Sequence, residues 1–399
     1  MSTVFEHAAF RRLWLANVLS QTGSQISRIG LILVVVERTG SVAALALLVC
    51  LEALPAAIAA PFAGAVVDRR SRRAVMVSAD LVRFGSVMVI LAAPTYDTIC
   101  AMAAVHSVAT GFFQPARAAM LPLAVPRQQI VTANSWDQGA ANIMFIVGPA
   151  LGTELLLALG LSWTLVVDGA TFLLSAALIP SLPGDIIRGS ERVPLLASAI
   201  EDIRSGWRYL RTHELALHLS ALFFVSLLCA GLWTPLAPFF VRDYLGGTSR
   251  LLGWQFSAFG TGAIVGSVIA PPLVRKCGRG ALMCAGLVGE GVCQTAYAMV
   301  PDIVVSTALM FGWGVVVSLI VVPFYSILQT VVDERFLGRV FSTVRQSENV
   351  AMAAALGLAI LLQGTLDSHT ILLAGGLIYC ALALGSFLTE GGRSLLGTR

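Results

Sequence analysis

Residues 42–73 read VAALALLVCLEALPAAIAAPFAGAVVDRRSRR. Glu52 is the only charged residue in the apolar part of this stretch, residues 42–66. That part exceeds the roughly twenty apolar residues that an α-helix needs to cross a bilayer. Four arginines follow within residues 68–73, and basic connections of this kind favour the cytoplasmic side of a membrane. The stretch therefore predicts a membrane-spanning helix followed by a cytoplasmic loop.

The rest of the chain repeats this pattern. Hydrophobic residues make up 57% of the 399 positions and charged residues 12%, whereas a soluble domain has about 25% charged residues. Stretches of spanning length lie at residues 13–37, 42–66, 74–96, 98–122, 135–158, 162–182, 214–240, 251–274, 281–300, 303–328, 346–364 and 368–388. The sequence thus predicts an all-α membrane protein with twelve transmembrane helices.

The basic residues orient these spans. With the N-terminus in the cytoplasm, 21 of the 26 Lys and Arg residues fall in cytoplasmic segments, whereas Arg28 and Arg83 fall within spans. Cytoplasmic loops of membrane proteins carry an excess of basic residues. We therefore expect a multi-pass protein of the cell (inner or plasma) membrane whose N- and C-termini are both cytoplasmic.

Two loops repeat at one offset of about 207 residues. Residues 71–76, SRRAVM, align with residues 278–283, GRGALM, and a second pair aligns residues 125–135 with 332–342. Parallel repeats are typical of transporters built from two similar halves around a site near the bilayer midplane. We expect two pseudo-symmetric six-helix bundles, residues 1–182 and residues 214–399 with a short cytoplasmic tail, joined by a cytoplasmic linker, residues 183–213.

The linker contains an amphipathic helical pattern. Its apolar positions recur at helical spacing, with charged residues on the other side: Leu196, Ile200, Ile203, Trp207 and Leu210. Such a helix lies on a membrane surface, although a simple tether between the halves is compatible with the same pattern. About thirty residues are too few for a soluble enzymatic domain.

Residues 64–73 resemble the signature loop of the major facilitator superfamily, Gly-x-x-x-Asp-Arg-x-Gly-Arg-Arg, with Ser71 in place of the loop glycine. The loop lies at the family's usual place, between the second and third spans. The resemblance implies a conformational latch that holds the two halves together, formed by Gly64, Asp68, Arg69, Arg72 and Arg73. Carboxylates at helix N-termini and arginines on carboxylates or phosphates make stabilising contacts. Arginines that only set the topology are the alternative.

Other motifs resemble a bacterial exporter branch of this superfamily, the one that includes the enterobactin exporter and macrolide-efflux proteins. Gly148, Pro149 and Gly152 look like the core of the span-five motif of drug:proton antiporters. Three further stretches match the branch: residues 10–14, FRRLW; residues 115–119, PARAA; and residues 167–172, VDGATF. The resemblance implies the major facilitator fold, with a central cavity lined by spans one, four, seven and ten.

Polar residues form stripes along two of these spans. The first span carries, at one helical spacing, Asn17, Gln21, Ser24, Gln25 and Arg28. The fourth repeats the pattern with His106, Thr110 and Gln114. Polar groups inside a membrane usually face a cavity or a partner, so we expect both stripes to line a water-filled substrate cavity. Hydrogen bonding between helices is the alternative, and His106 in particular fits a packing role as well as a proton or substrate role.

Aromatic side chains take the corresponding place in the second half. Trp233 and Tyr325 are the candidates for the cavity there. An aromatic and apolar wall suits a bulky amphipathic substrate. Packing of the rings against neighbouring helices explains them equally well.

Among the acids within predicted spans, four are singled out. Asp80 precedes Arg83 by three residues and is expected to form a structural ion pair with it. The other three are candidates for proton coupling, with Glu52 first, then Glu290 and Asp168. Desolvation favours the protonated form of an unpaired carboxyl group, and that is the property proton coupling needs.

The chain has no Gly-x-x-x-x-Gly-Lys-Ser/Thr, His-Glu-x-x-His or Gly-x-Ser-x-Gly motif. We therefore expect no enzyme, no metal site and no cofactor, with a proton gradient as the energy source. The leading hypothesis is a secondary active transporter that exports a small amphipathic molecule (a drug, siderophore or secondary metabolite) by proton antiport with alternating access. It would act as a monomer surrounded by membrane lipid, without nucleic acid. Uptake, lipid flipping and a non-transporting receptor or assembly partner are the alternatives.

Overall fold

The computed structural model of the chain describes residues 4–182, 195–363, 365–387, 389, 392, 394 and 395. For residues 61, 65, 68, 131, 195–200, 202, 334 and 363 it describes the backbone alone. Much of the predicted linker and the end of the tail therefore lie outside the described residues. Within the described ranges all regular secondary structure is helical.

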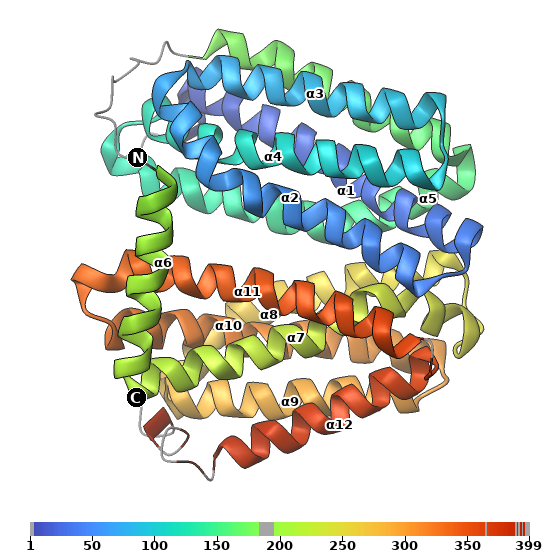
Figure 1. Ribbon diagram of the computed structural model, residues 1–399, viewed down its shortest axis with the longest axis vertical. Helices are drawn as coiled ribbons and strands as arrows, with labels where there is room; N and C mark the ends of the chain where they lie inside the picture. The colour runs from blue at the N-terminus through green and yellow to red at the C-terminus, as the bar shows by residue number, and fades with distance from the viewer. Residues whose placement is uncertain are drawn as a thin grey trace. The chain divides into compact units, whose positions relative to one another are not determined.

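The first part of the chain forms a bundle of long helices that run back and forth beside one another (Figure 1). They are α1 (Ala8–Thr39), α2 (Val42–Arg69), α3 (Arg72–Ala92), α4 (Tyr96–Ala124) and α5 (Ile130–Leu178), with short 3-10 turns at η1 (Val4–Glu6), η2 (Arg127–Gln129) and η3 (Ile179–Ser181). Helix α1 packs mainly on α5, and α3 packs on α4 and α5. Their apolar faces meet in a core that includes Phe10, Met76, Phe113 and Met120.

Helix α5 is two consecutive helices. Its 49 residues are interrupted at Gly160, whose φ of 81° and ψ of 174° are not helical. Glycine adopts positive φ without the steric cost that other residues incur. The predicted spans 135–158 and 162–182 end and begin on either side of this residue, so the bundle has six spans.

The second part of the chain forms a similar bundle. It contains α6 (Leu195–Thr212), α7 (Glu214–Asp243), α8 (Ser249–Cys277), α9 (Arg279–Met299), α10 (Ile303–Val331), α11 (Glu334–Gln363) and α12 (Ser368–Ser386). Helix α10 packs on α8 and α9, and α7 packs on α11 and α12. The core of this bundle includes Phe223, Leu287, Phe324 and Tyr379.

The offset of 207 residues recurs in the helices. Helices α2, α3 and α4 begin at residues 42, 72 and 96, and α8, α9 and α10 begin at 249, 279 and 303, which is 207 residues later in each case. One hydrogen bond repeats at the same offset: Arg72 Nη1 donates to the carbonyl oxygen of Ala119 (3.2 Å), and Arg279 Nη1 to that of Ser326 (3.5 Å). The two bundles are thus pseudo-symmetric.

Among the described residues, nine helices are long and apolar enough to cross a membrane, and α5 is one of them although it contains two spans. Helices α9 and α11 have 21 and 30 residues, which is enough to span. Both helices are less hydrophobic than those nine. Helix α9 carries Glu290 and Gln294, and the first half of α11 is rich in charged residues. The fold is therefore that of twelve transmembrane helices in two six-helix bundles.

The chain divides into two compact units, Met1–Gly40 with Leu47–Ser198, and Ser41–Ala46 with Ala199–Arg399. We name them the first unit and the second unit. The division falls inside α6, within the predicted linker. The predicted amphipathic helix is present, and Tyr209 and Leu210 bury one of its faces in the core of the second unit.

Trp207, another apolar residue of this helix, does not pack in that core. It is 44% exposed, and the Arg211 guanidinium lies 5.8 Å from its ring centre. The reason is Gly206, which lies so close to α11 that a Cβ atom there would overlap the Thr343 side chain. The contact line of α6 therefore runs through residues 206, 209 and 210, and Trp207 turns outward.

Candidate functional site: a polar cavity in the first unit

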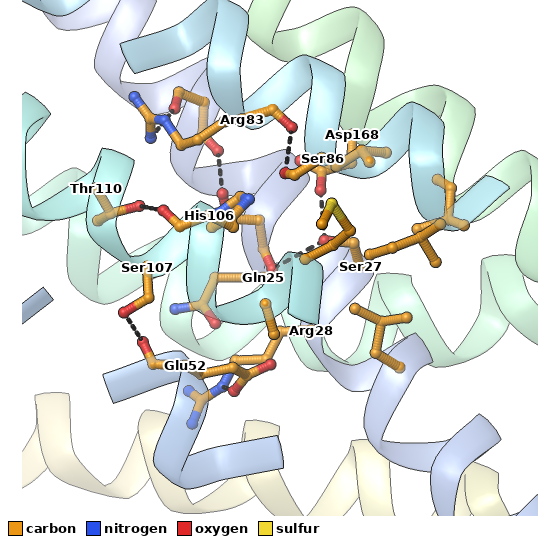
Figure 2. A pocket seen from close by; sticks show the side chains of 18 of the residues that line it. Gln25, Ser27, Arg28, Glu52, Arg83, Ser86, His106, Ser107, Thr110 and Asp168 are labelled. Carbon is orange, nitrogen blue, oxygen red and sulfur yellow. Dashed lines mark hydrogen bonds and ion pairs between the residues drawn. The ribbon is translucent and has the colours of Figure 1, made fainter. Parts of the chain in front are cut away.

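A cavity of about 370 Å³ in the first unit is lined by side chains of α1 to α5 (Figure 2). Its lining includes nine residues that the sequence singled out: Gln21, Ser24, Gln25, Arg28, Glu52, His106, Thr110, Gln114 and Asp168. It also includes Arg83, which the sequence predicts in an ion pair, and four serines that the sequence did not single out: Ser20, Ser27, Ser86 and Ser107. Short hydroxyl side chains give little signal in a sequence, because in helices they often bond to the carbonyl one turn back.

Helix α5 packs directly on α1 beside the polar face that lines this cavity. A Cβ atom on Gly152 would lie 2.6 Å from the carbonyl oxygen of Ile26, and one on Gly148 would lie 2.5 Å from the Cβ of Gln25. Both distances are too short for any side chain. The motif glycines around Pro149 therefore permit the close approach of α5 to α1.

Arg28 and Glu52 form an ion pair at the cavity wall, joining α1 to α2. Arg28 Nε donates to Glu52 Oε2 at 3.0 Å, and the two side chains are 41% and 18% exposed. The Ser107 hydroxyl of α4 donates to the backbone oxygen of Glu52 at 2.8 Å. Glu52, the first candidate for proton coupling, was considered as an unpaired acid, and the structure instead gives it a basic partner.

A second polar network lies beside the cavity and includes an acid that the sequence analysis missed. Asp137, in the first half of α5, accepts from Asn17 (2.8 Å) and pairs with Arg117. Gln21 donates to Asn17 (2.9 Å), and Arg117 also donates to Gln114 (3.2 Å). For Asn17, which is 1% exposed, hydrogen bonding between helices is therefore the better account. The sequence does contain a signal for this network, because Asp137 is an acid near the start of the predicted span 135–158.

Arg83 of the cavity lining forms the predicted ion pair with Asp80. Arg83 Nη2 donates to Asp80 Oδ1 at 2.5 Å, and the side chains are 3% and 0% exposed. Ser175 of α5 donates to the other Asp80 oxygen (2.7 Å), and Arg83 Nη1 donates to Ser20 of α1 (3.1 Å). This network ties α1, α3 and α5 together.

Asp168 lies near this pair but outside it. Its side chain is fully buried, and Oδ2 accepts from the Ser27 hydroxyl at 2.5 Å. Its Oδ1 atom has no hydrogen-bond partner in the described part of the chain. Buried polar atoms are nearly always hydrogen-bonded, so this bare oxygen at a cavity wall needs an explanation.

His106 both lines the cavity and packs between helices. Its ring meets the Phe172 ring edge-on, with centres 5.4 Å apart. Its backbone oxygen accepts from the Thr110 hydroxyl at 3.0 Å. The two interpretations of His106 drawn from the sequence are therefore compatible with each other.

In the second unit, Glu290 accepts three hydrogen bonds. It is 1% exposed and accepts from Ser226 (2.7 Å), Tyr379 (2.8 Å) and Trp313 (3.3 Å). These donors come from α7, α12 and α10, so Glu290 links four helices of the unit. A carboxylate with three donors is stabilised in place.

The two aromatic candidates of the second unit lie in different surroundings. Trp233 is 7% exposed and packs edge-on against Phe256 and Trp313, with ring centres 4.9 and 6.0 Å away. The Tyr325 hydroxyl donates to Glu348 at 2.8 Å. The packing interpretation accounts for Trp233, and the cavity role of both residues stays a prediction.

The signature loop has a structural role inside the first unit. The Ser71 side chain accepts from the Ala74 N–H at the start of α3, so the residue that replaces the loop glycine is a helix cap. Arg72 donates to a backbone oxygen of α4, and Arg73 to the backbone oxygens of Pro180 and Leu182. These bonds hold the ends of α3, α4 and η3 together.

For the other three residues of the predicted latch, the described part of the structure gives no contact that supports the latch. A Cβ atom on Gly64 would meet nothing within 4 Å, and Arg69 is exposed. The side chain of Asp68 lies outside the described residues. The latch stays a prediction.

Comparison with protein families identifies the family to which this architecture belongs. Residues 13–356 match the family model described as Major Facilitator Superfamily. The chain belongs to the major facilitator superfamily. The prediction drawn from residues 64–73 is confirmed, and the protein is a multi-pass membrane transporter of this superfamily.

Efflux proteins are among the relatives of this superfamily member. Macrolide efflux protein A of Streptococcus pyogenes is 28% identical over 400 residues, covering 96% of both chains. Multidrug efflux pump Tap of Mycolicibacterium fortuitum is 26% identical, covering 90% of both. The predicted resemblance to an exporter branch is thereby confirmed.

Solved structures share the fold. The nucleoside transporter NupG matches with a TM-score of 0.74 at 12% identity, covering 97% of this chain and 99% of its own. A bacterial homologue of the iron transporter ferroportin, in an inward-facing state, matches with a TM-score of 0.73 at 14% identity, covering 95% and 98%. At these identities the likeness concerns the fold alone.

Labelling of engineered cysteines tests whether the cavity is wet. In a variant without the seven native cysteines, we expect Gln21→Cys and Gln25→Cys to react with a membrane-impermeant thiol reagent, because both side chains line the cavity. Ala16→Cys, on the same helix but 0% exposed, is the control and should stay unlabelled. Complete protection of residues 21 and 25 in every transport state would show that the cavity is dry.

Proposed function

We propose that the protein is a secondary active exporter that moves a small amphipathic organic molecule out of the cell in exchange for protons. Candidate cargoes are a drug, a siderophore or a secondary metabolite. The observation that carries the proposal is the cavity of the first unit, which presents polar, charged and apolar side chains between helices long and apolar enough to span a membrane.

The lining suits such a molecule chemically. Arg28 and Glu52 provide charges of both signs, and the hydroxyl and amide side chains of α1 and α4 provide hydrogen-bond donors and acceptors. Between them lie apolar surfaces, from Leu31, Val87, Ile90, Met102 and Leu165. Ligand pockets of about 300–1,000 Å³ commonly combine apolar walls with a few placed polar groups, and a cavity of about 370 Å³ falls in that range.

The relatives support the direction of transport, and the sequence supports the energy source. Relatives that cover nearly the whole chain are named for efflux. The sequence lacks a phosphate-binding loop for ATP, so an ion gradient is the natural energy source. The excess of basic residues on one side favours cytoplasmic N- and C-termini in the inner membrane.

Parallel six-helix repeats are the architecture of transporters that work by alternating access. In that mechanism the two units expose a central site first to one side and then to the other. We propose that the loop at residues 64–73 latches one of these states and that a single chain suffices, since it contains both units.

An accumulation assay tests the function. In a bacterial host that lacks its main drug exporters, the protein is expected to lower the cellular accumulation of at least one compound of an amphipathic panel that includes radiolabelled erythromycin. A protonophore should restore accumulation. Gln21→Trp, which fills the cavity, should abolish export. Leu81→Trp is the matched control, since Leu81 is 50% exposed and outside the cavity lining.

Two results would contradict the proposal. One is unchanged accumulation of every compound although the protein is present in the membrane at normal abundance. The other is export that persists when the protonophore has collapsed the gradient. The second result would leave an exporter with a different energy source.

A further inference from the structure

Asp168 is a buried acid with an unused oxygen at the wall of the cavity. The side chain is 0% exposed, and Figure 2 shows it beside Ser86 and Ser27. One oxygen accepts from Ser27 at 2.5 Å. The other meets no hydrogen-bond donor among the described residues. An isolated carboxylate is very costly to bury without a compensating partner.

The neighbouring cation, Arg83, forms its ion pair with another acid, Asp80. Arg83 pairs with Asp80 at 2.5 Å, and Ser175 donates to the remaining Asp80 oxygen. The buried cluster therefore contains two carboxyl groups and one guanidinium group. If both acids were ionised, one negative charge would be left without a counter-charge.

Other charged and titratable groups around Asp168 do not supply that counter-charge. On the elements packed against it they are Arg28 of α1, Asp80 and Arg83 of α3, and His106 of α4. Arg28 is paired with Glu52 across the cavity. The His106 ring packs edge-on against Phe172, one turn further along α5. A cation that enters from the cavity is the remaining way to neutralise Asp168, and the smallest is a proton.

The other two acids fit this role less well. Glu52 has a basic partner at 3.0 Å. Glu290 accepts three hydrogen bonds in the second unit, so both of its carboxylate oxygens already have donors. Asp168 alone among the three combines full burial, a place at the cavity wall and an unpaired oxygen.

We propose that Asp168 is the group that carries the transported proton, an inference that rests on proton-coupled export as the function. When the cavity is open to the outside, a hydronium ion gives its proton to the Asp168 carboxylate, and a new O–H bond removes the negative charge. When the cavity is open to the cytoplasm, this O–H bond breaks and the proton returns to water. Arg83 and Asp80 stay paired throughout, and Ser27 positions the carboxyl group.

Infrared spectroscopy of the purified full-length protein tests the site without a substrate. On raising the pH, the wild-type protein is expected to lose absorption from the C=O stretch of a protonated carboxylic acid. Asp168→Asn should lack this band. Asp97→Asn, a matched change at an exposed acid of α4, should keep it. A band of unchanged intensity in Asp168→Asn would overturn the proposal.

A second variant serves if Asp168→Asn does not fold. Ser27→Ala keeps the carboxyl group and removes its hydrogen-bond donor. It should therefore shift the frequency of the band without abolishing it. A band with wild-type frequency in Ser27→Ala would show that it belongs to another acid.

Transport in proteoliposomes separates failure of this site from failure of the function, with radiolabelled erythromycin as the probe. Asp168→Asn should lose accumulation driven by a pH gradient but keep exchange of labelled for unlabelled erythromycin, because exchange needs no net proton movement. Gradient-driven accumulation by Asp168→Asn at the wild-type rate would overturn the inference. If instead the wild-type protein moves no erythromycin while the infrared band still depends on Asp168, the site stands and macrolide export fails.

Discussion

Replacing Arg83 with methionine is expected to destabilise the protein by about 3–5 kcal/mol, the usual cost of removing one partner of a buried ion pair. Arg83 is 3% exposed, and its loss leaves Asp80 fully buried without a counter-charge. The measurement is the free energy of unfolding, by titration with a denaturing detergent. Arg204→Met is the control, since Arg204 is exposed and surface substitutions rarely change stability by more than about 0.5 kcal/mol.

A double variant shows which interaction matters. The Arg83 guanidinium lies 4.2 Å from the ring centre of Phe113 and 4.9 Å from that of Phe172, besides its bond to Asp80. If the unpaired charge causes the loss, Asp80→Asn combined with Arg83→Met should recover most of the stability. No recovery would assign the loss to the aromatic contacts. A stable single variant would contradict the buried pair altogether.

Alanine at Gly314 is expected to cost about 1–3 kcal/mol or more, the range for overpacked cores. Helices α8 and α10 touch backbone to backbone at two reciprocal glycines. A Cβ atom on Gly314 would overlap the carbonyl oxygen of Phe259 and lie 2.8 Å from the nitrogen of Ala263, and one on Gly262 would overlap the carbonyl oxygen of Phe311. Backbone atoms cannot turn aside as a flexible side chain can, so the helices must separate.

Gly312 provides a control on the same helix. A Cβ atom there would meet nothing within 4 Å. Gly312→Ala should therefore be neutral or stabilising, since alanine has a higher helix propensity than glycine by about 1 kcal/mol. Detergent titration of the two variants side by side checks the difference. Equal stability of Gly312→Ala and Gly314→Ala would show that α8 and α10 are not in close contact.

Much of the fold was predictable because each membrane span can be recognised from its own hydrophobic residues. Residues 98–122 and 303–328 were predicted as spans, and α4 and α10 cover residues 96–124 and 303–331. A break in the long helix α5 was predicted between residues 158 and 162, and Gly160 provides it. The repeat was visible in two loops and recurs in the helix starts. These features depend on local composition and on spacing along the chain.

The candidate site was predictable only in part. The stripe on α1 showed which face of that helix is polar, and Gln21, Ser24, Gln25 and Arg28 do line the cavity. The pairing of Arg28 with Glu52, and of Asp137 with Arg117, could not be predicted from the sequence. These partners lie on different helices, and hydropathy does not say which face of one helix meets which face of another.

The order of residues along the chain is enough to predict about twelve membrane crossings in two related halves, and a polar face on the first helix. Transfer of each segment between water and lipid depends on that segment's own residues. Which acids have a neutralising partner, and which one lacks it, emerges from the packing of the helices. That outcome depends on distances between side chains of different helices, and it distinguishes Asp168 from Glu52 and Glu290.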